Sequence, residues 1–144
     1  MRHLVLGGAR AGKSRFAMTT AESASPAPVL IVTAEAHDEE MHSRIERHRK
    51  DRGEQWRVLE APTGLAAKLL PQLESGDVVV IDCLTLWLSN ALARDTWPRE
   101  RRAFIDAVAA FSSAPTQLLM VSNEVGNGVV PLGKLSRTFV DELG

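Results

Sequence analysis

The sequence has a single cysteine, Cys83, among its 144 residues. One cysteine cannot form an intramolecular disulfide, and its scarcity fits a reducing compartment. The length falls within the ~100–200 residues of one typical domain. A chain of this size buries roughly two-thirds of its unfolded surface, so its hydrophobic core can stabilise the fold without a disulfide. We therefore expect residues 1–144 to form one domain.

Strong charge of one sign is also missing, because the formal net charge is −1. A nearly neutral chain has no bulk electrostatic attraction to nucleic acid or to a membrane surface. The longest apolar runs are far shorter than the ~20 residues that a membrane-spanning helix needs. The N-terminus opens into a strand-like run and not into the basic and apolar regions of a signal peptide. We expect a cytoplasmic protein with no membrane span and no nucleic-acid partner.

Short apolar runs alternate along the chain with longer helix-like segments. Continuous apolar runs are typical of strands that are buried on both faces of a parallel sheet. This alternation predicts an α/β fold with a mostly parallel central sheet and helices on both faces. The expected strands are 3–6, 29–33, 78–82 and 118–122, with 56–60 as a weaker candidate. The expected helices are 13–22, 38–51, 63–74, 84–93, 99–111 and 133–143.

The segment GGARAGKS, residues 7–14, satisfies the pattern G-x-x-x-x-G-K-[ST] between an expected strand and an expected helix. Glycines let backbone N–H groups approach an anion closely, and the helix N-terminus adds partial positive charge. Lys13 is expected to reach the β- and γ-phosphates of a nucleotide, and Ser14 to bind Mg²⁺. The alternative is a glycine-rich turn whose serine caps the helix. The strand and helix on either side favour nucleotide binding.

A carboxylate follows the apolar run 78–81, because Asp82 stands at the end of an expected strand. Such a carboxylate can hold Mg²⁺ directly or through water. The alternative role for Asp82 is to cap the helix that is expected to start at Leu84. Motor-type ATPases tend to carry a glutamate after this aspartate to orient water, whereas Cys83 follows here. The sequence therefore favours transfer to a substrate over hydrolysis.

The segment RIERHRKDR, residues 44–52, places a histidine among arginines. On a helix, His48 shares a face with Ile45, and Arg44 lies one turn before it. One reading is a solvated helix edge whose arginines are balanced by nearby glutamates. The other is chemical, because a histidine can attack phosphorus to form a covalent intermediate while guanidinium groups neutralise the triphosphate and the leaving pyrophosphate. Spacing alone leaves both readings open.

The segment SNEVGNGVVP, residues 122–131, is a polar, glycine-containing loop after the last expected strand. It should lie at the same carboxyl edge of the sheet as the phosphate loop, where open α/β sheets bind ligands. Its composition suits substrate binding, but it fits an ordinary connecting loop equally well.

Together these segments resemble the bifunctional adenosylcobinamide kinase/adenosylcobinamide-phosphate guanylyltransferase family of adenosylcobalamin biosynthesis. The resemblance runs from the N-terminus to Gly144, and it is carried by GGARAGKSRFA, TAEAHDEEMHSRIERHRKDRGEQWRVLEAP, IDCLTLWLSN and VSNEVGNGVVPLGKLSRTFVDELG. Many kinases share the phosphate loop, whereas the arginine–isoleucine–two residues–histidine pattern and the NEVGxGxVP loop are much more specific. The resemblance implies a P-loop NTPase fold of the RecA-like group and a homo-oligomer, usually a trimer.

The resemblance also implies two reactions. ATP or GTP first phosphorylates the hydroxyl of the aminopropanol arm of adenosylcobinamide. GTP then guanylylates the resulting adenosylcobinamide phosphate through a GMP–histidine intermediate, which gives adenosylcobinamide-GDP and pyrophosphate. The catalytic residues implied are His48 and Lys13, and the Mg²⁺ ligands are Ser14 and Asp82. The nucleotide contacts implied are Gly7, Gly8, Ala9, Arg10, Ala11, Gly12, Lys13, Ser14, Thr33, Ala34, Glu35, Arg49, Lys50, Asp51, Arg52, Glu60 and Asp82.

The chain departs from the family pattern in two places. Ala11 stands where the family usually has serine, and we expect a mild effect because the loop geometry depends on its glycines. Family members normally continue past the final DELG with a further helix and strand, which we expect this chain to lack. Two other functions remain open on the residues alone. One is a small-molecule P-loop kinase in which His48 is only a helix-face residue, and the other is a nucleotide-binding switch protein without transfer activity.

Overall fold

The computed structural model describes residues 2–7, 12–35 and 55–123. The expected helices 38–51 and 133–143 lie outside these ranges. The described strands are β1 (Arg2–Gly7), β2 (Val29–Val32), β3 (Arg57–Glu60), β4 (Val78–Asp82) and β5 (Gln117–Asn123). The described helices are α1 (Lys13–Ala24), α3 (Leu65–Leu69), α4 (Leu84–Ala93) and α5 (Trp97–Ala110), with a 3₁₀ turn, η1 (Leu70–Gln72), after α3. No helix within the described ranges is long and apolar enough to cross a membrane.

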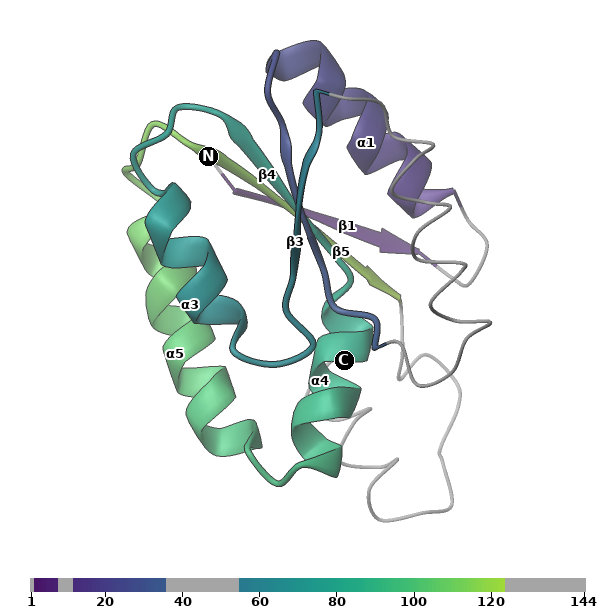
Figure 1. Cartoon of the computed structure of the whole chain (residues 1–144), viewed down its shortest axis with the longest axis vertical. Coiled ribbons are helices and arrows are strands. Elements are labelled where there is room, and N and C mark those ends of the chain that lie inside the picture. The colour runs from purple at the N-terminus through teal and green to yellow at the C-terminus, as the bar shows by residue number, and fades with distance from the viewer. Residues whose placement is uncertain (1, 8–11, 36–54, 124–144) are drawn as a thin grey trace.

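The described strands form one sheet in which every pair is parallel, in the order β1-β5-β4-β2-β3. The register aligns the strand ends, because Asp82 pairs with Val121 of β5 and Val32 pairs with both Asp82 and Glu60. The carboxyl ends of all these strands therefore meet at one edge of the sheet. Strand β5 lies between β1 and β4 (the three strands are labelled in Figure 1), so Gly7 at the end of β1 and Asp82 at the end of β4 lie on either side of one strand.

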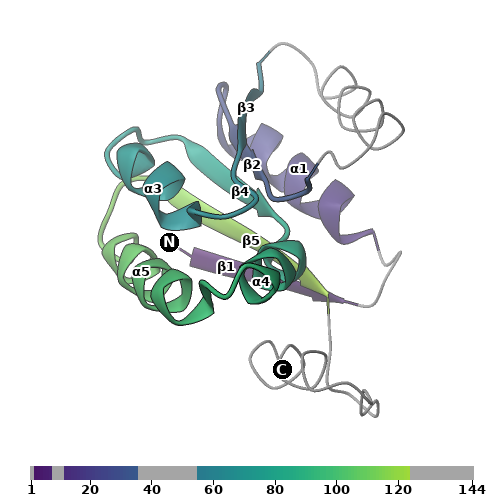
Figure 2. The same cartoon turned by 60° about the horizontal axis from the view of Figure 1, so that its bottom comes forward.

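Side chains on the inner strands alternate between two apolar layers. In β2, Val29 and Ile31 pack with helices α3, α4 and α5, whereas Leu30 and Val32 pack with α1. Figure 2 shows α1 on one side of the sheet and the other three helices on the opposite side. Each fully buried aliphatic side chain stabilises the fold by about 1.5–3 kcal/mol. The predicted α/β fold with helices on both faces is confirmed. Helices on both faces hold the strands, and with them the edge at which their carboxyl ends meet, in place.

Of the helix boundaries that differ from those expected, two are explained by a proline. The helix predicted over 63–74 is wrong in extent, because α3 spans only Leu65–Leu69 and a 3₁₀ turn replaces its last part. Pro71 has no backbone N–H to donate and its ring clashes with the preceding turn, so the α-helix cannot continue through it. Helix α5 begins at Trp97 and includes Pro98, which the sequence placed before the helix. Proline is tolerated in a first turn, where its missing N–H would have no partner within the helix.

Candidate nucleotide-binding site

The phosphate loop connects the end of β1 to the start of α1. Gly7 ends β1, and Lys13 and Ser14 are the first residues of α1. Gly12, directly before the helix, has a φ of 79°, which a residue with a Cβ rarely adopts. The first turn of α1 contains no acidic side chain, so its positive end remains suited to an anion. The remaining loop residues that the sequence predicted as nucleotide contacts lie outside the described ranges: Gly8, Ala9, Arg10 and Ala11.

The side chains of Ser14 and Asp82 meet at this edge of the sheet. The Ser14 Oγ donates a hydrogen bond of 3.0 Å to Asp82 Oδ2. Helix capping, the alternative role that the sequence left open for each residue, is not what either residue does. Gly12 is the N-cap of α1 and Cys83 is the N-cap of α4, and neither N-cap has a side-chain capping hydrogen bond. The two side chains therefore face each other, and neither caps the helix that follows its motif.

The chemistry of this pair fits the expected Mg²⁺. A hydroxyl and a carboxylate are hard oxygen donors, and neighbouring ligands on an octahedral Mg²⁺ lie about 2.9 Å apart when the bonds are about 2.0–2.1 Å. The Oγ–Oδ2 distance of 3.0 Å is that of a hydrogen bond, and it leaves the two oxygens close enough together to bind one cation. Within the described ranges there is no group of three or more His, Cys, Asp or Glu residues that could hold a metal. A Mg²⁺ site of this kind takes its other ligands from phosphate and water.

The end of β2 is fastened to the end of β4 by Thr33. Its hydroxyl donates to the Cys83 carbonyl at 2.7 Å and accepts from the Cys83 N–H at 2.9 Å. Its own N–H donates to the Asp82 carbonyl at 3.2 Å. The buried Thr33 side chain therefore makes its hydrogen bonds to the backbone of Cys83, next to Asp82. Ala34 and Glu35 follow Thr33 along this edge of the sheet.

Burial raises the pKa of the Cys83 thiol, and the nearby charge of Asp82 raises it further.

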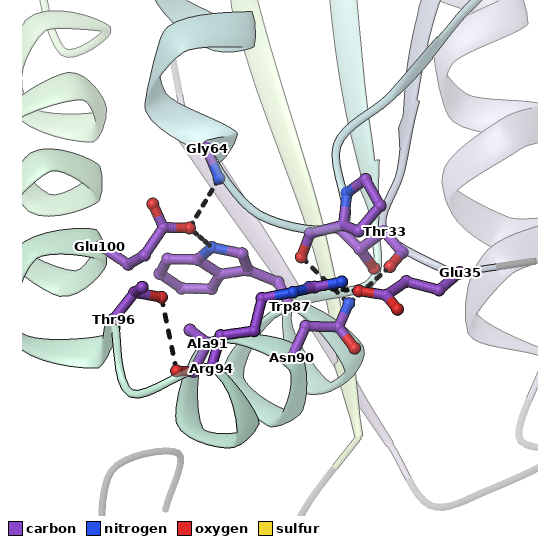
Figure 3. Close-up of polar contacts among 10 residues, drawn as sticks. Thr33, Glu35, Gly64, Trp87, Asn90, Ala91, Arg94, Thr96 and Glu100 are labelled. Atoms are coloured by element: carbon purple, nitrogen blue, oxygen red, sulfur yellow. Dashed lines mark hydrogen bonds and ion pairs between the residues drawn. The ribbon is translucent and has the colours of Figure 1, made fainter. Parts of the chain in front are cut away.

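Helix α4 provides two contacts to the same segment that the sequence did not predict. The Asn90 side-chain amide donates to the Thr33 carbonyl at 2.9 Å and to the Pro62 carbonyl at 3.0 Å. One turn later, the Arg94 guanidinium forms an ion pair with the Glu35 carboxylate. Figure 3 shows both side chains reaching from α4 toward the end of β2. The sequence shows that Asn90 and Arg94, four residues apart, share one face of a helix. It does not show which residues these two side chains contact.

Glu100 of α5 supports α4 from its other side. One carboxylate oxygen, Oε1, accepts hydrogen bonds from the Gly64 backbone N–H at 2.7 Å and from Trp87 Nε1 at 2.9 Å. Trp87 is buried in α4 and its ring contacts Trp97 with a centroid distance of 5.1 Å. Figure 3 shows Glu100 between the start of α3 and Trp87. The helix that carries Asn90 and Arg94 is therefore tied to α5 by packing and by a charged hydrogen bond.

The structure gathers the described part of the predicted site at one edge. Lys13 and Ser14 begin α1 after β1, Asp82 ends β4, the segment 33–35 follows β2, and Glu60 ends β3. The predicted residues His48, Arg49, Lys50, Asp51 and Arg52 lie outside the described ranges, as do residues 124–131 of the polar loop.

Comparison with solved structures supports the fold. A unique ATP synthase subunit, NeqB, from Nanoarcheaum equitans superimposes with a TM-score of 0.51 at 10% sequence identity, over 99% of this chain and 43% of that chain. At such low identity the likeness concerns the fold alone. It agrees with the predicted P-loop NTPase fold.

Comparison with known sequences identifies the family. Residues 3–144 match the family described as cobinamide kinase / cobinamide phosphate guanyltransferase. The bifunctional adenosylcobalamin biosynthesis protein CobP of Pseudomonas aeruginosa is 48% identical over 147 residues, which cover 100% of this chain and 83% of that protein. The bifunctional adenosylcobalamin biosynthesis protein CobU of Escherichia coli is 35% identical over 157 residues, covering 100% and 86%. The chain therefore belongs to the family of bifunctional cobinamide kinases and cobinamide phosphate guanylyltransferases of cobalamin biosynthesis, as its motifs predict.

Proposed function

We propose that both transfers of this family use the edge of the sheet built from residues 7–14, 33–35, Glu60 and Asp82. ATP or GTP is held by the phosphate loop, and Mg²⁺ is held by Ser14 and Asp82. The observation that supports this most directly is the 3.0 Å hydrogen bond between Ser14 and Asp82, which joins two motifs that are distant in the sequence. Without a cation, Asp82 would repel the phosphates that Lys13 attracts, so the carboxylate itself argues for a bound metal.

In the kinase reaction, the hydroxyl of the aminopropanol arm of adenosylcobinamide attacks the γ-phosphorus of the nucleotide. A new oxygen–phosphorus bond forms, the hydroxyl loses its proton to solvent, the bond from the γ-phosphorus to its bridging oxygen breaks, and the nucleoside diphosphate leaves. Lys13 neutralises the β- and γ-phosphate oxygens, and the N–H groups at the start of α1 add their partial positive charge. Bound Mg²⁺ supplies further charge neutralisation at these oxygens. Positioning and electrostatic stabilisation account for most of the catalysis in such transfers.

In the guanylyl transfer, we assign the nucleophile to His48. Its imidazole attacks the α-phosphorus of GTP and pyrophosphate leaves, which gives a GMP–histidine intermediate. A phosphate oxygen of adenosylcobinamide phosphate then attacks the same phosphorus, forms adenosylcobinamide-GDP and restores His48. We assign Arg49, Lys50, Asp51 and Arg52 to nucleotide binding. These assignments rest on the sequence pattern of the family, because residues 44–52 lie outside the described ranges.

Intact-protein mass spectrometry after incubation with Mg²⁺ and GTP tests the covalent step. The wild type should gain the mass of GMP, His48→Ala should gain nothing, and the matched control His42→Ala should behave as the wild type. A folded, GTP-binding wild type without an adduct would contradict the histidine nucleophile. An adduct that survives in His48→Ala would assign the nucleophile to another residue.

We also propose that the chain works as a homo-oligomer, with a trimer as the expected state. The support is the family resemblance, and a trimer is a closed cyclic assembly of the kind that soluble homo-oligomers form. Light scattering after size-exclusion chromatography should give a mass well above that of the 15.7 kDa chain, three times that mass for a trimer. A monomeric mass together with normal activity in both reactions would refute this proposal.

A further inference from the structure

Helix α4 connects two parts of the nucleotide-binding edge. It begins directly after Asp82 and Cys83, and it ends with Arg94 as its C-cap. Asn90 and Arg94 are four residues apart, so they share one face of the helix. That face contacts the segment that follows β2. Any shift of the segment 33–35 relative to Asp82 would therefore have to break contacts made by this helix.

The Asn90 amide links the segment that follows β2 to the segment that follows β3. Its nitrogen donates to the carbonyl of Thr33, after β2, and to the carbonyl of Pro62, after β3. Both partners can only accept, so the side chain must present its nitrogen to them. An aspartate at this position would have the same size but would place a carboxylate oxygen against two carbonyl oxygens. The geometry thus requires an amide.

The ion pair between Arg94 and Glu35 holds the next side chain of the same segment. Glu35 is 13% exposed and Arg94 is 46% exposed, so the pair lies at the boundary between protein and solvent. A planar guanidinium fixes the direction of a carboxylate that it contacts, so this pair should set the orientation of Glu35. Because the Glu35 carboxylate is largely buried, loss of the Arg94 charge should also lower the free energy of unfolding.

We propose that Asn90 and Arg94 are positioning residues for nucleotide binding. Asn90 holds the Thr33 backbone, and Arg94 holds the Glu35 carboxylate, in the place that the nucleotide needs relative to Asp82. The proposal rests on the proposed function, because it takes the segment 33–35 as a nucleotide contact. An ordered segment has little conformational entropy left to lose when the ligand binds, so its release should weaken nucleotide binding. Once GTP is saturating, the transfer steps should proceed at nearly the normal rate.

Titration calorimetry with Mg²⁺ and GTP, together with steady-state kinetics of both reactions, tests this role. Asn90→Asp should raise the Kd for GTP roughly tenfold, which corresponds to about 1.4 kcal/mol, and should raise the KM for GTP while kcat changes less than twofold. Arg94→Gln should raise the same constants by about threefold, and Arg94→Lys should restore part of the loss. The matched control Ser89→Ala, exposed on the same helix, should bind GTP as the wild type.

Two further variants separate this proposal from the proposed function. The Kd of Lys13→Ala for GTP tests the phosphate loop directly, and the Kd of Glu35→Gln tests the segment 33–35 directly. If both bind GTP normally, the proposed site is wrong. If they lose affinity while folded Asn90→Asp and Arg94→Gln keep the wild-type Kd, only the role of α4 is overturned. A lowered kcat with an unchanged KM in the α4 variants would overturn it as well. Should Asn90→Asp fail to fold, the exposed Arg94 still provides the test.

Discussion

The hydroxyl of Ser14 donates to the carboxylate of Asp82 across 3.0 Å, although the two residues are 68 positions apart in the chain. One follows β1 and the other ends β4, with β5 between these strands. The contact brings the two oxygen donors of the expected Mg²⁺ site together at one edge of the sheet.

Replacement of Lys13 with alanine should abolish kinase turnover. The ammonium group at the start of α1 would no longer neutralise the β- and γ-phosphates, and loss of one such charged donor costs on the order of 10²–10³ in kcat. Lys68→Ala is the matched control, because Lys68 is exposed on α3. Initial rates of adenosylcobinamide phosphorylation measure the effect. A near-normal rate in folded Lys13→Ala would remove Lys13 from the catalytic residues.

Replacement of Asp82 with asparagine should weaken the response to Mg²⁺. The amide keeps the size of the side chain but removes the charge that a hard cation prefers. We expect turnover to fall on the order of 10²-fold at a fixed Mg²⁺ concentration, with partial recovery as Mg²⁺ is raised. Mg²⁺ titrations of the kinase rate measure both effects. The control is Asp106→Asn on the exposed face of α5, and an unchanged Mg²⁺ dependence in Asp82→Asn would refute the metal assignment.

Glu100→Ala should lower the stability of the fold. Its carboxylate accepts from the Gly64 N–H and from the Trp87 indole, so truncation leaves two partly buried donors without their acceptor. An unsatisfied buried donor costs about 1–3 kcal/mol. Urea unfolding followed by tryptophan fluorescence measures the change in the free energy of unfolding. Glu74→Ala, at an exposed position before β4, is the control and should differ little from the wild type.

Cys83 should react slowly with alkylating reagents near neutral pH. Burial raises the pKa of its thiol, and the charge of Asp82 adds to this, so less of the reactive thiolate is present than for an exposed cysteine. The rate of iodoacetamide labelling, followed by intact mass, should rise steeply with pH above the ordinary pKa of a thiol. Because this is the chain's single cysteine, the label reports on one site. Labelling as fast as that of glutathione at pH 8 would contradict the raised pKa.

The same shift has a consequence for stability. The folded chain holds the Cys83 proton more tightly than the unfolded chain does, so the associated stability is present below the ordinary thiol pKa. It is lost as pH rises through the raised pKa of the folded state. The unfolding free energy of the wild type should therefore fall more steeply in alkaline solution than that of Cys83→Ala. Equal slopes for the two proteins would argue against the shift.

Local chemistry made several elements predictable. The bounds of β4 and α4 agree with the sequence prediction, because a β-branched run and an apolar helical stretch meet at Asp82 and Cys83. The extent of α3 was not predicted, since the helical pattern of 63–74 continues across Pro71 while the backbone cannot. The contacts of Asn90 were not predicted either, because their acceptors are backbone carbonyl groups. Every residue has a backbone carbonyl, so the residue types in the sequence do not show which one accepts the bond.

The sequence by itself determined the phosphate loop, the carboxylate at Asp82, the alternating α/β pattern and the family. These are properties of short segments, and their residue types carry the chemistry directly. Only the tertiary structure decided that β5 separates β1 from β4, that Ser14 faces Asp82, and that α4 holds the segment 33–35. Periodicity reports which residues are buried, but the choice of partner is made by the packing of the whole sheet and its helices.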